Sequence, residues 1–246
     1  MKKEVIFTDL DGTLLDHDTY SYAKAKSALN IVKKKKIPLI ICTSKTRAET
    51  EVYRKKLGIK DPFIVEDGGA IFIPNKKTIE LGTSYKKLRA ELKKLKKRFL
   101  IVGFGDMTPA QLKKDAGLTL KQARLAEKRD YDEPFIIVRP KDKKIILNKI
   151  KKAGFNYTKG GRYYHLMGKN DKGKAVRILS GILRKKYGKI KTIGIGDSQN
   201  DFKMLSKVDK PYLVMKKNKK YASNKYNRAG AVGPAGWNKV IKKEIK

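Results

Sequence analysis

The chain has 246 residues, enough for one ordinary domain or for a core that carries a smaller second domain. Hydrophobic residues make up 40% of it and it has 12 tyrosines, which argues against a disordered chain despite 35% charged residues. The 61 lysines and arginines against 24 acidic residues give a net charge of +37, a field that attracts polyanions. Because the lysines are spread along the whole chain, we expect a Lys-rich surface and no nucleic-acid partner.

The only cysteine, Cys42, lies in an apolar run, so no intramolecular disulfide can form and a reducing compartment is favoured. The chain starts with a charged, strand-like segment where a secreted protein has an apolar signal core. No apolar run approaches the length needed to cross a bilayer. These features predict a cytoplasmic protein without a membrane partner, and no feature specifies an oligomeric state.

Strand-like and helix-like segments alternate in the first third of the chain. The expected order is a strand at 4–8, a helix at 21–35, a strand at 38–42, a helix at 46–57 and a strand at 63–65. This series predicts a parallel sheet with helices on both faces. A turn at 67–69 then leads into an expected hairpin of segments 70–74 and 78–81.

The pattern changes near residue 82, where a small α+β unit is expected. Its helices are expected at 85–99, 108–116, 120–129 and 143–153, and its strands at 100–104, 135–139 and 163–167. The α/β pattern then resumes, with helices at 173–187, 202–208 and 237–245 and strands at 192–196, 211–214 and 230–233. The predicted fold class is therefore α/β, with a core of residues 1–82 and 169–246 and an inserted α+β cap of residues 83–168.

Two carboxylates come directly after the first expected strand. Asp9 and Asp11 lie in the segment 8–13, where Gly12 permits the sharp turn that follows. In an open α/β sheet, this edge is where ligands bind. One carboxylate could face a substrate while the other lies across the same crevice, although such a pair can also be a simple turn or helix cap.

Two further segments could contact a phosphoryl group. Thr43 and Ser44 follow the second parallel strand, where their hydroxyls and backbone N–H groups open a helix; either could also be a plain N-cap. Lys172 opens a later helix, where an ammonium could meet both a nucleophilic carboxylate and a phosphate oxygen. Among 61 basic residues, a single lysine is a weak indication by itself.

A fourth segment, 193–201, ends another apolar strand with clustered acidic and amide groups. Its Asp197, Asn200 and Asp201 offer hard oxygen ligands of the kind that hold Mg²⁺. An Asx-rich loop has the same composition, so this segment alone is not decisive. All four segments lie at strand ends or helix starts.

In this order, the four segments resemble the four motifs of the haloacid dehalogenase superfamily, and the resemblance spans nearly the whole chain. It implies a Rossmann-like core with a parallel sheet, a cap that closes over it, and Mg²⁺-dependent phosphatase chemistry. The resemblance narrows to the mannosyl-3-phosphoglycerate phosphatase family through segments 42–49, 66–74, 128–135, 160–166 and 171–176. This implies hydrolysis of mannosyl-3-phosphoglycerate to mannosylglycerate, a compatible solute. Asp67 is a departure, because this family usually has Asn there.

The resemblance also implies a role for each core residue. Asp9 attacks phosphorus and forms an aspartyl-phosphate, while Asp11 protonates the leaving alkoxide and then activates the hydrolytic water. Lys172 keeps Asp9 ionised. The implied metal ligands are Asp9, the backbone carbonyl of Asp11, Asp197 and, either directly or as an orienting group, Asp201. The implied phosphate-binding residues are Thr43, Ser44 and Asn200.

The family-like cap segments contain candidates for binding the glycerate carboxylate and the sugar hydroxyls: Arg129, Glu133, Arg162, Tyr163 and His165. Tyr163 and His165 could instead be ordinary strand packing, and Arg129 and Glu133 could form an ion pair within the cap. The expected partner is a small anionic phosphorylated sugar or glycosyl-glycerate. The alternatives are a phosphatase for glucosyl-3-phosphoglycerate or hexose phosphates, and a basic nucleic-acid-binding protein that has lost catalysis.

Overall fold

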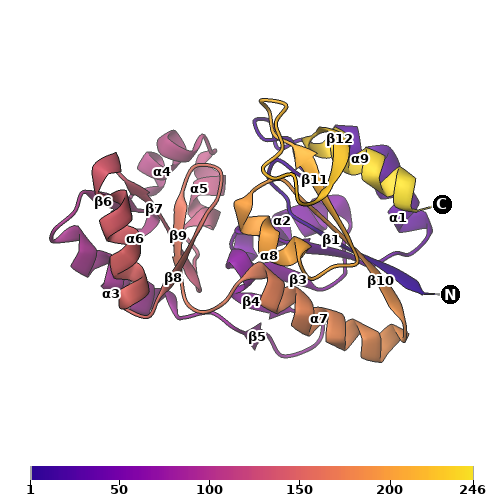
Figure 1. The fold of residues 1–246 in the computed structure, drawn as a ribbon, viewed down its shortest axis with the longest axis horizontal. Coiled ribbons are helices and arrows are strands. Elements are labelled where there is room, and N and C mark those ends of the chain that lie inside the picture. The colour runs from indigo at the N-terminus through magenta and orange to yellow at the C-terminus, as the bar shows by residue number, and fades with distance from the viewer. Residues whose placement is uncertain (1, 246) are drawn as a thin grey trace.

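The computed structural model describes residues 2–245, which fold around two separate sheets (Figure 1). Within these residues, the larger sheet has eight strands in the order β12-β11-β10-β1-β2-β3-β4-β5, and the smaller has four in the order β6-β7-β9-β8. The unit around the larger sheet is referred to below as the core and the other as the cap. Both ends of the described chain lie on the side of the core that faces away from the cap. The predicted α/β fold class is confirmed.

Six neighbouring core strands are parallel: β1 (Lys3–Thr8), β2 (Leu39–Cys42), β3 (Phe63–Val65), β10 (Ile190–Gly196), β11 (Lys210–Met215) and β12 (Asn227–Val232). The sheet ends in an antiparallel pair, β4 (Ala70–Phe72) and β5 (Ile79–Glu80), which corresponds to the expected hairpin. Strands β10, β1 and β2 lie at its centre, so their carboxyl ends meet at one protected edge.

Helices cover both faces of the core sheet, because successive strand residues point to opposite faces. On β1, Ile6 joins one hydrophobic cluster while Val5 and Phe7 join the other. The first face is covered by α1 (Lys26–Lys34), α2 (Arg47–Leu57) and α9 (Gly233–Glu244), and the second by α7 (Lys172–Tyr187) and α8 (Phe202–Leu205).

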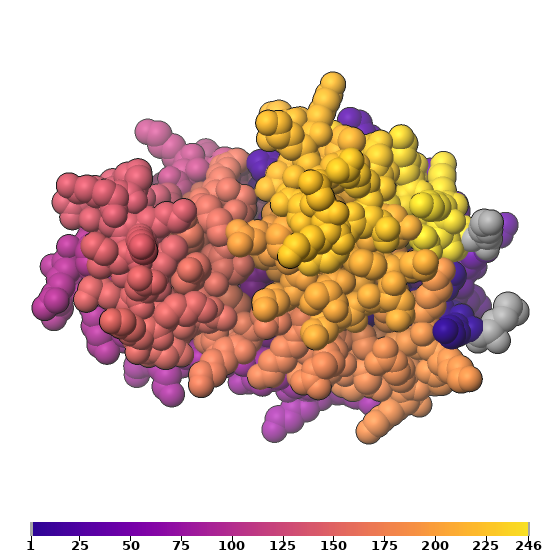
Figure 2. All heavy atoms as spheres, viewed as in Figure 1, coloured from indigo at the N-terminus to yellow at the C-terminus, as the bar shows by residue number. Residues whose placement is uncertain are grey.

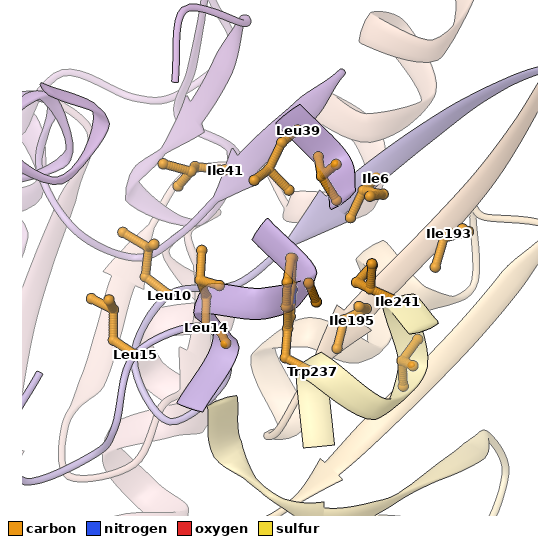
Figure 3. Packing of buried hydrophobic residues seen from close by; sticks show 14 of the residues in the cluster. Ile6, Leu10, Leu14, Leu15, Leu39, Ile41, Ile193, Ile195, Trp237 and Ile241 are labelled. Atoms are coloured by element: carbon orange, nitrogen blue, oxygen red, sulfur yellow. The ribbon is translucent and has the colours of Figure 1, made fainter. Parts of the chain in front are cut away.

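Trp237 of α9 packs at the centre of the first cluster (Figure 3). It is fully buried, and its indole N–H donates to the hydroxyl of Thr8 at 3.1 Å. A buried tryptophan usually finds such a partner for its one polar atom. This contact fixes the end of β1 immediately before Asp9.

The cap sheet is antiparallel, with strands β6 (Ile101–Gly103), β7 (Asp132–Ile137), β8 (Asn156–Lys159) and β9 (Tyr164–Met167). Its hydrophobic cluster joins leucines of α3 (Tyr85–Lys96) to residues of α6 (Lys143–Lys152). A smaller cluster holds α4 (Pro109–Ala116) and α5 (Leu120–Ala126). In the space-filling view, the cap and the core are in contact along their shared border (Figure 2). Among residues 2–245, no helix is both long and apolar enough for a membrane span.

The observed elements differ from the expected ones at several points. The strand β8 was not expected, because its residues Asn-Tyr-Thr-Lys are half-buried and form no apolar run. The strand β7 starts at Asp132 and not at 135, and α5 ends at Ala126 and not at 129, because the chain between them is bound by the core. Short 3-10 turns, which the sequence pattern does not reveal, lie at Ala23–Ala25, Glu66–Gly68, Phe104–Asp106, Pro140–Asp142 and Gln199–Asp201.

Candidate active site

Three central strands bring polar side chains to one edge of the core sheet. Asp9 follows β1, Thr43 follows β2 and Asp197 follows β10. Thr8 is in register with Ile195 of β10 and Ile41 of β2, so the three strands end at the same level. Parallel strands thus gather residues that are far apart in the sequence, which is the arrangement expected at a ligand-binding edge.

Lys172 lies between two buried carboxylates. Its ammonium is 2.9 Å from Asp9 Oδ1 and 2.8 Å from Asp201 Oδ1, and Asp67 Oδ1 follows at 3.9 Å. The lysine is the first residue of α7, whose N-cap Asp171 accepts the backbone N–H of Lys174. Burial alone would lower the pKa of Lys172, but the surrounding carboxylates outweigh it and hold the pKa well above its usual value.

Asp9, Asp197 and Asp201 form a cluster in which one oxygen of each lies within 4.8 Å of the others. Burial raises the pKa of Asp9 despite Lys172, and the other carboxylates raise it further. Burial and Asp201 also raise the pKa of Asp197, to about 6. Three buried carboxylates beside one ammonium leave an excess of negative charge, and hard oxygen donors suit a divalent cation. The residues present therefore fit a divalent metal.

Asp201 contributes to the shape of this cluster. Its Oδ2 accepts the backbone N–H of Asp197 at 3.0 Å and of Ser198 at 3.2 Å, while its Oδ1 pairs with Lys172. Both oxygens are thus already engaged within the protein. This geometry favours the orienting role for Asp201 over direct metal ligation.

The side chain of Asp11 pairs with Lys45, whose ammonium lies 2.9 Å from Asp11 Oδ2. Lys45 is buried and also lies 3.4 Å from Glu49 Oε1. Burial alone would lower the pKa of Lys45, but Asp11 and Glu49 together raise it. Our sequence reasoning missed Lys45 and Glu49, although Lys45 directly follows Ser44 in the motif. The position of Glu49 three residues after Thr46 could also have identified a capping box.

The expected phosphate-binding residues lie around the same edge. Thr43 is buried and its hydroxyl accepts the backbone N–H of Lys45 at 3.2 Å, while Ser44 is partly exposed and faces the cavity. The side-chain amide of Asn200 donates to Asp67 Oδ1 at 3.2 Å. Ser44 and Asn200 line the same cavity as Asp9.

A cavity lies between the cap and this edge of the core. Its core wall includes Asp9, Asp11, Ser44, Lys45 and Asn200, with His17 and Tyr20 from the loop after β1. Its cap wall includes four of the five expected cap residues: Arg129, Arg162, Tyr163 and His165. Among the described residues, Glu133 is the expected cap residue that does not line this cavity. The expected core residues outside its lining are Thr43, Lys172, Asp197 and Asp201.

The sequence suggested an ion pair between Arg129 and Glu133. This pair does not form, because each residue has a different partner. Glu133 is buried inside the cap, where Arg89 lies 2.6 Å from its Oε1. Arg129 pairs with Asp132 and donates to the carbonyl oxygen of Ser44 at 3.1 Å. Arg129 therefore connects the cap to the core at Ser44.

The remaining cap residues differ in their surroundings. His165 is buried, with Nδ1 2.7 Å from Asp132 Oδ2 and 3.7 Å from Asp67 Oδ2 of the core. The hydroxyl of Tyr163 donates to Asp115 Oδ2 at 2.7 Å. Arg162 is exposed, and its guanidinium donates to the carbonyl oxygen of Asp115 at 3.4 Å.

The fully buried carboxylate of Glu66 binds the cap backbone. It accepts N–H groups of Asp130 (3.1 Å), Tyr131 (2.7 Å) and Asp132 (3.0 Å). Glu66 and Asp67 both have positive φ angles, of 47° and 51°, which is strained backbone for residues with a side chain. Such strain persists where surrounding contacts enforce it, here at the junction of core and cap.

Comparison with known proteins places the chain in a family. Residues 6–224 match the haloacid dehalogenase-like hydrolase family. A relative from Methanococcoides burtonii, named glucosyl-3-phosphoglycerate/mannosyl-3-phosphoglycerate phosphatase, is 49% identical over 97% of this chain and 96% of its own length. A protein of the same name from Persephonella marina is 45% identical over 96% and 95%. A mannosyl-3-phosphoglycerate phosphatase from Pyrococcus horikoshii is 37% identical over 89% and 94%.

Solved structures share the fold. A Thermoplasma acidophilum protein superimposes with a TM-score of 0.75 over 99% of this chain and 98% of its own, at 20% identity. A haloacid dehalogenase-like hydrolase from B. subtilis gives 0.73 over 99% and 100%, at 16% identity. At such identities the likeness concerns the fold alone.

Proposed function

The chain belongs to the haloacid dehalogenase-like hydrolase family, and we propose that it is a phosphatase that hydrolyses mannosyl-3-phosphoglycerate to mannosylglycerate and phosphate. The main support is the 49% identity, over nearly the full length of both chains, to an enzyme named for that substrate. The buried Asp9–Lys172 pair beside the acidic cluster supplies the required chemistry. Glucosyl-3-phosphoglycerate is a second candidate substrate, because the two relatives of 49% and 45% identity are named for both sugars.

In the proposed reaction, Asp9 attacks phosphorus, the bond from phosphorus to the glycerate oxygen breaks, and an aspartyl-phosphate forms. Asp11 gives a proton to the leaving alkoxide and later takes one from the water that hydrolyses the aspartyl-phosphate. Lys172 orients the Asp9 carboxylate and favours its ionised form, because a nearby positive charge stabilises a carboxylate. Thr43, Ser44 and Asn200 hold the phosphate oxygens.

Mg²⁺ is the proposed cofactor, held by Asp9, Asp197 and the backbone carbonyl of Asp11, and when bound it offsets the negative charge of the phosphoryl group. Asp201 holds Lys172 and the backbone at 197–198, as its hydrogen bonds suggest. We also propose that residues 83–168 act as the cap that excludes water over the core of residues 1–82 and 169–246. The proposed substrate, a phosphorylated glycosyl-glycerate, is a small anion. The protein is proposed to be cytoplasmic, because a single buried cysteine, Cys42, suits a reducing compartment.

The test is phosphate release, with Mg²⁺, from a panel of mannosyl-3-phosphoglycerate, glucosyl-3-phosphoglycerate, hexose phosphates and para-nitrophenyl phosphate. We expect the two glycosyl-phosphoglycerates to give the largest kcat/KM. A preference for hexose phosphates would contradict the proposed substrate. Asp9→Asn should abolish release from every compound, and full activity of this variant would contradict the mechanism. A nucleic-acid-binding protein would instead show binding without phosphate release.

A further inference from the structure

Lys45 occupies a constrained place beside Asp11. Its side chain is 8% exposed, and its ammonium is 2.9 Å from Asp11 Oδ2 and 3.4 Å from Glu49 Oε1. The rings of Tyr20 and Tyr53 flank the ammonium, with centroids at 5.1 Å and 5.7 Å. Two carboxylates and two aromatic rings around one cation restrict where its charge can lie.

Glu49 is itself fixed by the start of α2. Its Oε2 accepts the backbone N–H of Thr46 at 3.0 Å, and its own N–H donates to the Thr46 hydroxyl at 3.1 Å. This capping box ties a carboxylate to the helix backbone. The other oxygen of Glu49 faces Lys45, so the backbone of α2 positions the ammonium through Glu49.

Asp11 is held by one oxygen only. Oδ2 pairs with Lys45, whereas Oδ1 is buried and has no hydrogen-bond partner within residues 2–245. A carboxyl that gives a proton to an alkoxide and later takes one from water needs a fixed orientation and an oxygen without a competing partner. The Glu49–Lys45–Asp11 chain of contacts meets both conditions.

We propose that Lys45 is a positioning residue that holds Asp11 for proton transfer in the reaction proposed above. Lys45 does so with one strong ionic hydrogen bond to Oδ2. Asp11 lines the cavity and its side chain is 37% exposed, so the carboxyl held by Lys45 is open to a substrate there. Recognition of a substrate carboxylate by Lys45 is disfavoured, because two protein carboxylates already match its single charge. The inference rests on the proposed phosphatase activity and on Asp11 as its acid and base.

The test compares two leaving groups. A glycerate alkoxide needs a proton from Asp11 as it leaves, whereas para-nitrophenolate leaves without one. Because general acid catalysis contributes about 10²- to 10⁴-fold, Lys45→Met should lower kcat/KM for mannosyl-3-phosphoglycerate by roughly 10- to 100-fold. For para-nitrophenyl phosphate, the loss should stay within about 3-fold, since kcat/KM reports only the steps up to the aspartyl-phosphate. Lys45→Arg should recover most of the activity, and Lys55→Met, on the exposed side of α2, serves as the control.

A double-mutant cycle with Asp11→Asn provides the second measurement. If Lys45 acts through Asp11, Lys45→Met should cause no further loss in the Asp11→Asn background. Equal losses with both substrates, losses that multiply in the double variant, or unchanged activity of Lys45→Met would each overturn the positioning role. The proposed function fails separately, through retained activity of Asp9→Asn or through wild-type protein that releases no phosphate from either glycosyl-phosphoglycerate.

Discussion

The ammonium of Lys172 lies 2.9 Å from Oδ1 of Asp9, and both groups are buried at the carboxyl edge of the core sheet. Burial raises the pKa of Asp9, and Lys172 is the neighbouring group that opposes this rise. A nucleophilic carboxylate must be ionised before it attacks phosphorus. In the proposed reaction, Lys172 therefore favours the ionised form of Asp9 that attacks phosphorus.

Lys172→Met should lower kcat by about 100-fold or more, because the pKa of Asp9 rises further when its cation is lost. The acidic limb of the pH–rate profile should move to higher pH, since more alkaline conditions are then needed to ionise Asp9. Steady-state phosphate release across a pH series measures both effects. Lys174→Met, an exposed lysine on the same helix, is the matched control. An unshifted acidic limb in Lys172→Met would contradict this role.

Mg²⁺ should stabilise the folded protein, because a cation relieves the repulsion among Asp9, Asp197 and Asp201. At free Mg²⁺ of about 100 times Kd, the gain of about 2.7 kcal/mol should raise the melting temperature by roughly 5 °C for a chain of this size. Differential scanning fluorimetry with and without a chelator measures the shift. Asp197→Asn should remove most of it, whereas Asp130→Asn, exposed at the cap, should not. An equal shift in Asp197→Asn would exclude this cluster as the metal site.

The core residues could be predicted from the sequence because each lies at the end of a regular element. The apolar periods of β1, β2 and β10 locate the strands, and parallel strands in sequence order share a carboxyl edge. The positions of Asp9, Thr43 and Asp197 at this edge can be inferred from the ends of those strands alone. The local hydrophobic pattern and the order of the motifs were therefore sufficient to predict the positions of these core residues.

Contacts between elements could not be predicted in the same way. Glu66 binds backbone N–H groups 64 to 66 residues further along the chain, and Glu133 pairs with Arg89, 44 residues earlier. No periodicity links such positions, because the pairing depends on how the cap packs and docks. The half-buried strand β8 was missed for a related reason, since its residues show no apolar run.

Arg162 should determine the affinity for a substrate that carries a carboxylate. It is exposed at the cavity and donates to the carbonyl of Asp115 at 3.4 Å, so its guanidinium can also reach an anion. A hydrogen bond to a charged group contributes about 1.5 to 3 kcal/mol, so Arg162→Met should raise KM for mannosyl-3-phosphoglycerate roughly 10- to 100-fold. KM for para-nitrophenyl phosphate should change by less than about 2-fold, because that compound has no carboxylate.

Arg98→Met, an exposed arginine elsewhere in the cap, is the control for the change in net charge. If Arg162→Met raised KM for both substrates alike, Arg162 would act through the general field of the cap and not through the glycerate carboxylate.

Glu66 links the stability of the core–cap junction to pH. Burial and the neighbouring Asp132 raise its pKa to about 8, although Arg129 and the backbone N–H groups of Tyr131 and Asp130 act in the opposite direction. A carboxyl whose pKa is higher in the folded than in the unfolded chain binds its proton more tightly when folded. Its contribution to the free energy of unfolding is therefore fully present below the ordinary value near 4.5 and is lost as the pH rises through about 8.

Glu66→Gln removes this titration and keeps an oxygen that can accept the cap N–H groups. The free energy of unfolding of the wild type minus that of Glu66→Gln should therefore fall by roughly 1 to 3 kcal/mol between about pH 6 and pH 9. Urea unfolding at a series of pH values measures the difference, and Glu127→Gln, a partly exposed cap residue, should show none of this trend. A difference that stays constant or grows with pH would mean that Glu66 is ionised throughout, as its three backbone donors alone would favour.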